Sequence, residues 1–548
     1  MFPSSTELPS KVLTHMLPFG MCTTNQPKRS HNIPYIALLP RCSTLRHLKQ
    51  VHAQTVVAGL FRFAFTAGKV LSFAALSNYA DMAYAEAIFD HTPSPDVFQF
   101  NVMMMGLSKD PRSARTVFTY RDMIREGIGP NSRTFAALSK ACGCSAVLGQ
   151  VHCHVMKFGF DRDVYTVSSL MNAYFGVGST EDAVSLFNES STKNVVCWTC
   201  LISGYCSAGL VDEARRVFDE MPLRNDVSYS AMVSGYVNNG RFNEAIELFR
   251  GVKGATTVRL SESLLVGVLN ACTAVGALEE GRWVHSYMER NGIGYELELG
   301  TALIVFYGKC GFTEAAREVF CKMHVKDVST WSALILGLGI NGLSDEALET
   351  FRQMEENGPE PNAVTFVAAL VACNTTNLID ESWRLFGLMT ERYDIAPTIE
   401  HYGCMVDLLA RAGKIEEAYA LLNRMPVKPD GTILGSMLNG CLLHGYIELG
   451  KEFGRLSIEM EPKHSGRYVL LSNIHASMGC WEDVIQLRRR IKIDGVLPAV
   501  AWSFIEIDGL VHRFVVGDKS HPCLGSITEV LNNLTTELIC LFDAAMTS

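Results

Sequence analysis

Apolar and polar residues follow one another along most of the chain in a unit that recurs at a fixed spacing. Its clearest mark is an alanine that closely follows an acidic residue and precedes a phenylalanine by four positions. Residues at i and i+4 share one face of a helix, so the small side chain leaves room for a bulky neighbour. Five copies, separated by 31, 31, 71 and 31 residues, are centred on Ala183, Ala214, Ala245, Ala316 and Ala347.

Each copy predicts two helices joined by a tight turn. An apolar segment comes first, such as VSTWSALILGLG at 328–339, and a glycine such as Gly342 follows it. Glycine suits the left-handed position after a helix, and acids such as Asp345 favour the first turn of the next helix. One helical hairpin cannot bury its apolar face alone. We therefore expect an all-α fold in which hairpins stack into a right-handed α-solenoid with a concave inner surface.

Histidines recur at one position of the longer units. The segments RCSTLRHLKQVHAQTVVAGL, ACGCSAVLGQVHCHVMKFGF and ACTAVGALEEGRWVHSYMERNGI place His52, His152 and His285 equivalently. Read alone, His152 and His154 would resemble a pair of metal ligands. Because His152 occupies a repeat position, we expect no metal there.

The segment VCWTCL contains Cys197 and Cys200, the one C-x-x-C of the sequence. A zinc site of that type needs a second pair of ligands at suitable spacing, and none accompanies it. The surrounding VVCWTCLISGY is parallel to the first helical segment of the other units. We expect a repeat helix without a metal.

Composition narrows the class of protein. The 548 residues are 48% hydrophobic and carry a net charge of −9, which argues against binding nucleic acid through bulk charge. The 17 cysteines are scattered, which is typical of small buried residues in a reducing compartment. No apolar run is long enough to cross a membrane.

The N-terminal end has a different composition from the rest. The first 80 residues contain one acid, Glu7, and eight Lys or Arg residues. Residues 1–31 are rich in Ser, Thr and Met and lack a continuous apolar core, which is typical of an organelle transit peptide and not of a secretory signal. A disordered start is the alternative.

The repeat units resemble the pentatricopeptide repeat family, in the plant PLS subclass that alternates standard, long and short repeats. The segment PTIEHYGCMVDLLARAGKIEEAYALLNRMPVKPD at 397–430 resembles the last short repeat of that subclass, while YVLLSNIHASMGCWEDVIQLRR and WSFIEIDGLVHRFVVGDKSHP resemble its E and E+ extensions. The resemblance implies about 11 repeats over 32–430, E-motif repeats over 431–500 and the E+ extension over 501–548. In that extension Asp508-Gly509 predicts a short β-hairpin, followed by a C-terminal helix.

The resemblance also implies which side chains read RNA. In this family one repeat reads one base of single-stranded RNA through the fifth residue of its first helix and the last residue of the repeat. Apolar residues at the second position, here including Phe98, Val196 and Val364, would sandwich the base. The base-reading pairs are Asn101 with Asn131, Ser168 with Asn194, Thr199 with Asn225, Ser230 with Ser261, Thr301 with Asp327, Ser332 with Asn362 and Gly403 with Asp430.

These pairs predict a preferred RNA sequence. Two asparagines favour C over U, a hydroxyl beside Asn favours A, and a hydroxyl beside Asp favours G. The pairs built on Ser230 and Gly403 are uninformative, as are Gly68 with Asp96, Ala136 with Asp163, Val266 with Glu296 and Val367 with Thr398. Read from 5′ to 3′, we expect C/U-n-A-A-n-n-G-A-n-n.

The sequence does not contain the residue pattern of a cytidine deaminase. Deamination of cytidine in RNA uses an H-x-E segment and a C-x-x-C around zinc. None of the 15 histidines is followed two positions later by Glu, and the deaminase-like DYW domain that follows E+ in many relatives is not recognisable. We therefore expect no enzyme, no cofactor, no metal and no small-molecule substrate, with His521 in a structural role.

The first hypothesis is a specificity factor for C-to-U editing of organelle transcripts. Its partners would be single-stranded organelle RNA, a DYW-type deaminase recruited in trans and organelle editing accessory proteins, with no membrane. We expect a mitochondrial location, with the chloroplast as the alternative. A factor for organelle RNA stability, splicing or translation and a protein–protein scaffold are the other hypotheses. For the C-terminal extension, a cap on the apolar end of the solenoid is an alternative to a docking role.

Overall fold

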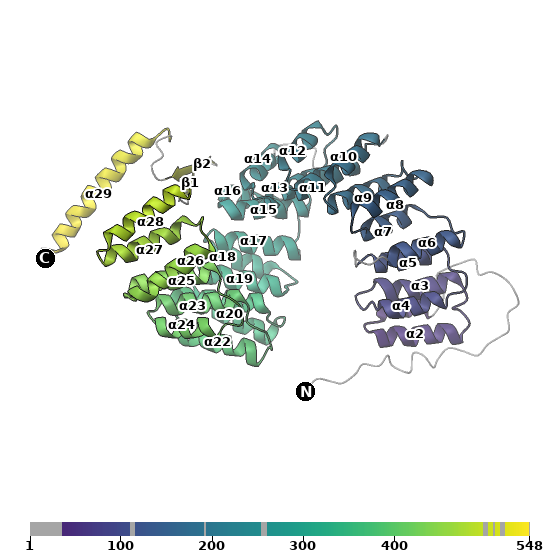
Figure 1. Cartoon of the computed structure of the whole chain (residues 1–548), viewed down its shortest axis with the longest axis horizontal. Coiled ribbons are helices and arrows are strands. Elements are labelled where there is room, and N and C mark those ends of the chain that lie inside the picture. The colour runs from purple at the N-terminus through teal and green to yellow at the C-terminus, as the bar shows by residue number, and fades with distance from the viewer. Residues whose placement is uncertain are drawn as a thin grey trace. The chain divides into compact units, whose positions relative to one another are not determined.

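A computed structural model of the chain describes residues 35–109, 115–190, 193–253, 260–496, 502–507, 510–515 and 521–546. The predicted transit peptide at 1–31 and the predicted turn at Asp508-Gly509 lie outside these residues. The chain divides into two compact units, Met1–Gly240 and Arg241–Ser548. Each unit consists mainly of helices, as Figure 1 shows.

The first unit begins with a short 3-10 helix and continues with α-helices. In chain order they are η1 Ile36–Arg41, α2 Leu45–Val57, α3 Ala64–Leu76, α4 Met82–Asp90, α5 Val97–Leu107, α6 Arg115–Arg125, α7 Ser132–Ala141, α8 Ser145–Lys157, α9 Val164–Gly176, α10 Thr180–Glu189, α11 Val195–Ser207, α12 Val211–Glu220 and α13 Asp226–Asn238.

The second unit contains the remaining helices and a pair of strands. In chain order they are α14 Phe242–Lys253, α15 Glu262–Val275, α16 Leu278–Arg290, α17 Leu297–Lys309, α18 Thr313–Lys322, α19 Val328–Ile340, α20 Ser344–Asn357, α21 Ala363–Thr376, α22 Ile379–Glu391, α23 Ile399–Arg411, α24 Ile415–Arg424, α25 Gly431–His444, α26 Ile447–Met460, α27 Ser465–Ser477, α28 Trp481–Ile493, β1 Trp502–Ile507, β2 Leu510–Val515 and α29 Leu524–Met546.

Two rows of helices build each unit. The odd-numbered helices, α3 to α13 in the first unit and α15 to α27 in the second, are the first helices of the hairpins, and each contacts the next in its row. The even-numbered helices pack behind them, mostly against the first helix of their own hairpin and that of the next (Figure 1). The core therefore lies between the rows, and the expected all-α solenoid of helical hairpins is confirmed.

The repeating alanine and phenylalanine hold successive hairpins together. The five repeat alanines are buried to 2% exposure or less. Four of the phenylalanines meet an aromatic ring of the following first helix edge to face: Phe187 with Trp198 at 4.9 Å between ring centroids, Phe218 with Tyr229 at 5.1 Å, Phe320 with Trp331 at 4.8 Å and Phe351 with Phe366 at 5.4 Å. Such pairs contribute about 0.5–1.5 kcal/mol each beyond their burial.

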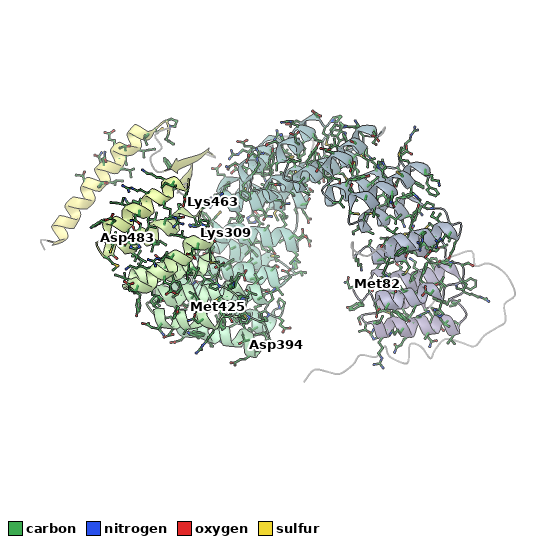
Figure 2. All side chains as sticks on the ribbon, in the orientation of Figure 1. Met82, Lys309, Asp394, Met425, Lys463 and Asp483 are labelled. Atoms are coloured by element: carbon green, nitrogen blue, oxygen red, sulfur yellow. The ribbon has the colours of Figure 1, made fainter. Side chains whose placement is uncertain are left out.

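The turns inside the hairpins use the left-handed backbone conformation that the sequence predicts. Gly240, Gly311 and Gly342 have φ values of +74°, +83° and +78°. Asn377 after α21 takes the same region at +61°, and so does Asp394, which Figure 2 labels and which lies between two hairpins after α22, at +52°. Asn and Asp tolerate it better than other residues with a Cβ, because their short polar side chains bond locally.

One pair of glycines allows two first helices to approach closely. A Cβ on Gly308 of α17 would lie 2.9 Å from the Cα of Gly337 on α19. Any larger residue at either position would push the two helices apart. The spacing of first helices in this part of the second unit therefore depends on two residues without side chains.

The C-terminal part differs from the repeats. Strands β1 and β2 pair antiparallel, with Trp502 opposite Val515 and Ile507 opposite Leu510. Helix α29 follows them. No helix among the described residues combines the length and the apolar character that crossing a bilayer requires.

Candidate nucleic-acid interface

The predicted reading residues fall at fixed places on the observed helices. The first helices begin at residues that put every predicted reader at the fifth helical position, as for Asn101 in α5 and Ser332 in α19. The second reader of each pair is the residue immediately before the next first helix. One geometry therefore recurs along the row of first helices within each unit.

The second reader of a pair is usually also the N-cap of a helix. Its side-chain oxygen accepts a hydrogen bond of 2.9–3.1 Å from the backbone N–H three residues later. The residues that do so are Asn131, Asn194, Asn225, Asp327, Asn362 and Asp430. Ser261 precedes α15 without such a bond. Each cap stabilises the folded chain by about 1 kcal/mol.

Capping determines which polar group of the side chain is left for a ligand. In an asparagine cap Oδ1 accepts the backbone N–H, so the Nδ2 amide, a donor, is the group not used by the helix. In an aspartate cap the second carboxylate oxygen, an acceptor, takes its place. On the Watson–Crick edge adenine N1 and cytosine N3 accept, whereas guanine N1–H and uracil N3–H donate. Asparagine caps therefore suit A or C, and aspartate caps suit G or U.

Three of the predicted pairs are joined through a buried threonine. Asn101 donates from Nδ2 to Oδ1 of Asn131 at 3.0 Å, and the Thr134 hydroxyl donates to Oδ1 of Asn101 at 2.7 Å. In the second unit Thr330 lies 2.8 Å from Thr301 and 2.9 Å from Asp327, and Thr365 lies 2.8 Å from Ser332 and 3.1 Å from Asn362, measured between side-chain oxygens. All three linking threonines are fully buried. Sequence reasoning missed them, although each lies three residues after a cap.

Two other pairs have no threonine three residues after the cap. Ser168 donates to the carbonyl of Tyr165 at 3.1 Å, and Thr199 donates to that of Val195 at 2.8 Å, so both bond within their own helix. The position of the linking threonine beside Asn194 is held by Cys197, which is fully buried. Ser168 and Thr199 fall at the fifth helical position, in register with the threonine-linked residues.

The C-x-x-C at the start of α11 is part of this packing. Cys197 is buried in the core of the first unit, and Cys200 is half-buried. Burial raises the pKa of both thiols. The neutral thiol is therefore favoured over the thiolate that binds metals and attacks disulfides.

Exposed apolar side chains alternate with the readers. The second residue of several first helices is a large apolar side chain that is 39–64% exposed: Phe98, Tyr165, Val196, Val227 and Val364. Three of these were predicted, whereas Tyr165 and Val227 were missed although they have the same offset from a cap. A regular series of exposed apolar groups beside polar readers offers successive flat contacts to bases.

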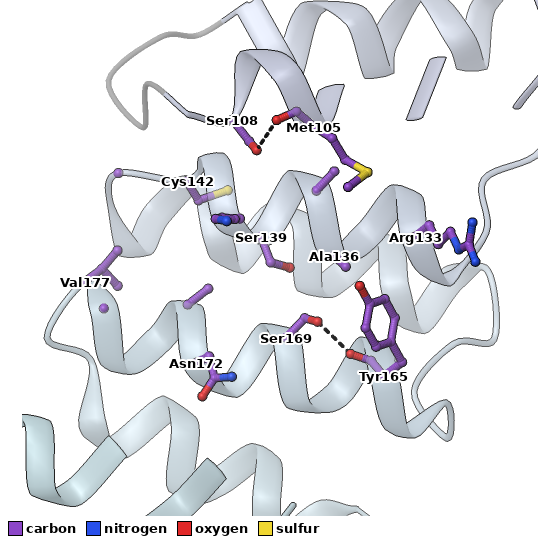
Figure 3. A pocket seen from close by; sticks show the side chains of 15 residues that line it. Met105, Ser108, Arg133, Ala136, Ser139, Cys142, Tyr165, Ser169, Asn172 and Val177 are labelled. Atoms are coloured by element: carbon purple, nitrogen blue, oxygen red, sulfur yellow. Dashed lines mark hydrogen bonds between the residues drawn. The ribbon is translucent and has the colours of Figure 1, made fainter. Parts of the chain in front are cut away.

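A groove opens where a long repeat lacks a polar reader (Figure 3). It has a volume of about 850 Å³ and lies along α5, α7 and α9, with Ala136 at the fifth position of α7. Arg133, Lys140 and Tyr165 are exposed on its lining. Ala136 offers no hydrogen bond to a base edge, but the two cations can contact a phosphate and the tyrosine can stack.

The recurring histidines are bonded to tyrosines. The Nδ1 atoms of His52, His152 and His285 lie 2.8, 3.2 and 2.8 Å from the hydroxyls of Tyr84, Tyr174 and Tyr307. His154 likewise lies 3.0 Å from the hydroxyl of Tyr120. Burial lowers the pKa of the three repeat-position histidines, so they are neutral at neutral pH. They join helices within the stack.

Comparison with known families matches most segments of the chain. Profiles described as PPR repeat match residues 165–195, 192–222, 227–254, 301–328 and 400–428, and one described as PPR repeat family matches 326–375. The E motif matches 444–503 and the E+ motif matches 511–538.

Known proteins resemble this chain over nearly its whole length. Pentatricopeptide repeat-containing protein At5g66520 of Arabidopsis thaliana is 44% identical over 90% of this chain and 80% of its own. Pentatricopeptide repeat-containing protein At2g20540 of the same plant is 39% identical over 92% of this chain and 94% of its own. A solved structure of the pentatricopeptide repeat protein PPR10 with an 18-nt psaJ RNA element aligns with a TM-score of 0.42 and 19% identity, over 85% of this chain and 74% of that one.

Proposed function

The chain belongs to the pentatricopeptide repeat family, and from that premise we propose that it binds one segment of single-stranded organelle RNA and directs C-to-U editing of a cytidine downstream of it. Binding would follow the first helices, one base to each standard or short repeat. The deaminase would act in trans, recruited through the E and E+ segments at 444–503 and 511–538.

One observation carries the RNA-binding part of the proposal. Capping side chains and exposed apolar side chains recur at the same helical positions in successive repeats. Single-stranded nucleic acid presents the same alternation, because each nucleotide carries a flat apolar face and a polar edge. A protein–protein scaffold would not require donors and acceptors in the same register from one repeat to the next.

Specificity would come from the caps. Asn194, Asn225 and Asn362 offer amide donors to adenine N1, and Asp327 offers a carboxylate oxygen to the N1–H of guanine. Asn131, linked directly to Asn101, suits the N3 acceptor of cytosine. This chemistry supports the expected sequence C/U-n-A-A-n-n-G-A-n-n.

The charge of the protein fits recognition by base contacts. Because the net charge is −9, the release of counterions from RNA phosphates should contribute little to the affinity for RNA. Stacking and edge contacts would supply most of it, so affinity should fall only weakly with added salt. A basic RNA-binding protein would lose affinity much more steeply.

The editing role is tested by comparing organelle transcripts of plant lines that contain or lack the protein. The proposal predicts loss of C-to-U conversion at one or a few cytidines, each preceded by a match to the expected sequence. Normal editing with altered transcript ends or splicing would contradict it and favour an RNA-processing factor. The same lines, with a fluorescent fusion of the full chain, test the proposed mitochondrial location against the chloroplast.

A further inference from the structure

Three potential metal ligands meet at one turn of the E-motif region. His475 lies in the last turn of α27, Cys480 is the N-cap of α28, and Asp483 lies in the first turn of α28, where Figure 2 labels it. Their ligand atoms all lie within 4.8 Å of one another. In the part of the chain that the structure describes, no other three residues of these types do so.

The backbone turn brings the ligands together. Gly479 takes a left-handed φ of +73°, and the N–H groups of Met478 and Cys480 both donate to the carbonyl of His475, at 3.3 and 3.0 Å. The end of one helix and the start of the next are thereby fixed within one tight loop. The arrangement does not depend on contacts among the three side chains themselves.

One ring nitrogen of His475 has an ion-pair contact but makes no hydrogen bond. Its side chain is only 9% exposed, and Nδ1 lies 3.2 Å from Oδ2 of Asp483 without making a hydrogen bond. A buried ring nitrogen without a hydrogen bond destabilises a folded protein. A cation held between Nδ1 and the carboxylate would satisfy both groups.

We propose that His475, Cys480 and Asp483 bind a Zn²⁺ ion. A neutral imidazole, a thiolate and a carboxylate carry two negative charges, which balance the ion, and imidazole with thiolate is a donor set that zinc prefers. Zinc bonds of about 2.0–2.3 Å in a tetrahedron place neighbouring ligand atoms about 3.3–3.6 Å apart. The observed spacing reaches that arrangement through small side-chain rotations.

A cavity beside the proposed ligands leaves room for a fourth zinc ligand. A cavity of about 470 Å³ is lined by His475 and Asp483, with Glu459 of α26 also on its wall. A water molecule completes the tetrahedron there. Binding replaces the thiol proton of Cys480 by the ion and releases that proton to solvent. The zinc then joins α27 to α28 and stiffens the hairpin.

The first test uses the full chain, freed of metal and titrated with Co²⁺ as a spectroscopic substitute for Zn²⁺. We expect one equivalent of cobalt to produce a thiolate-to-cobalt charge-transfer absorption that Zn²⁺ then abolishes. Cys480→Ser should remove the band and weaken cobalt binding at least about tenfold, and His475→Gln should weaken cobalt binding by at least as much. Serine is a good N-cap, so the first variant keeps the start of α28. Cys153→Ser and Cys321→Ser, which change exposed cysteines elsewhere, should keep the band.

A second measurement needs no variant. Zn²⁺ should slow alkylation of Cys480 in the wild-type chain at least about tenfold while leaving exposed Cys321 unchanged, as followed by peptide mass spectrometry. Three results would each overturn the proposal. They are the absence of the charge-transfer band, its persistence in Cys480→Ser, and a rate of Cys480 alkylation that zinc does not change. None of these results bears on RNA binding by the repeats.

Discussion

Exchanging one capping carboxylate for an amide should change which base a repeat prefers without changing the fold. Asp327 uses Oδ1 to accept from the backbone N–H and the hydroxyl of Thr330, both at 2.9 Å, and this leaves Oδ2 for the ligand. In Asp327→Asn the oxygen keeps the cap and the amide nitrogen takes the place of Oδ2. Asn and Asp cap helices about equally, so the free energy of unfolding should change by less than about 0.5 kcal/mol.

The expected effect on binding is much larger. A hydrogen bond to a charged group contributes about 1.5–3 kcal/mol, and each 1.4 kcal/mol is a factor of ten in affinity. The ratio of affinities for G over A at the matching nucleotide should therefore fall by about 10- to 150-fold. Fluorescence anisotropy with the full chain and four RNAs that differ at that nucleotide measures the ratio directly.

Asp163 provides a matched control within the same chain. It caps α9 with the same two bonds, from the backbone N–H and the hydroxyl of Thr166 at 2.8 and 2.7 Å. Its partner at the fifth position is Ala136, which has no polar atom, so Asp163→Asn should leave base preference unchanged. Equal losses for all four RNAs in Asp327→Asn, or the same switch in the control, would refute the reading mechanism.

Further expectations concern the linking residues, the apolar contacts and pH. Cys197→Thr places beside Asn194 the hydroxyl that Thr365 provides beside Asn362, and it should strengthen the preference for A by about 0.5–1.5 kcal/mol in the same anisotropy assay; an unchanged preference would contradict the role given to the threonines. Tyr165→Ala should weaken RNA binding by about 1–3 kcal/mol with little change in urea unfolding, because the ring is 55% exposed; unchanged affinity would exclude stacking. Burial holds the folded-state pKa of His285 and its two equivalents below the usual 6.5, so their contribution to stability is complete above that pH and is lost on acidification. The urea concentration at the midpoint of unfolding should therefore fall as the pH is lowered below 6.5. A midpoint that rises would contradict the direction of this pH dependence.

Much of the repeat architecture follows from local sequence. The spacing of Ala183, Ala214 and Ala245 predicts hairpins because small and aromatic residues must share a helix face, and glycines such as Gly240 predict the turns because few other residues take a positive φ. The predicted readers fall at the fifth helical position because the cap before each first helix sets where it begins. Sequence patterns predict the hairpins, the turns and the positions of the readers, because each of these features is set by residues close together in the chain.

Contacts between repeats were less accessible to sequence reasoning. Thr134 bonds to Asn101, 33 residues earlier, and nothing in either helix alone indicates that link. Tyr165 has the same offset from its cap as Phe98 and Val196, so a local rule could have found it, but the groove beside it appears only in three dimensions. His475 and Cys480 carry no recognised spacing motif, and their proximity to Asp483 comes from a turn whose path the sequence does not reveal.

Selection of bound RNAs from a random-sequence pool by the full chain tests the central claim most directly. The account predicts enrichment of C/U-n-A-A-n-n-G-A, with the G replaced by A when the selection is repeated with Asp327→Asn. Enrichment of an unrelated sequence, or binding without any base preference, would contradict the claim that the capping side chains read RNA.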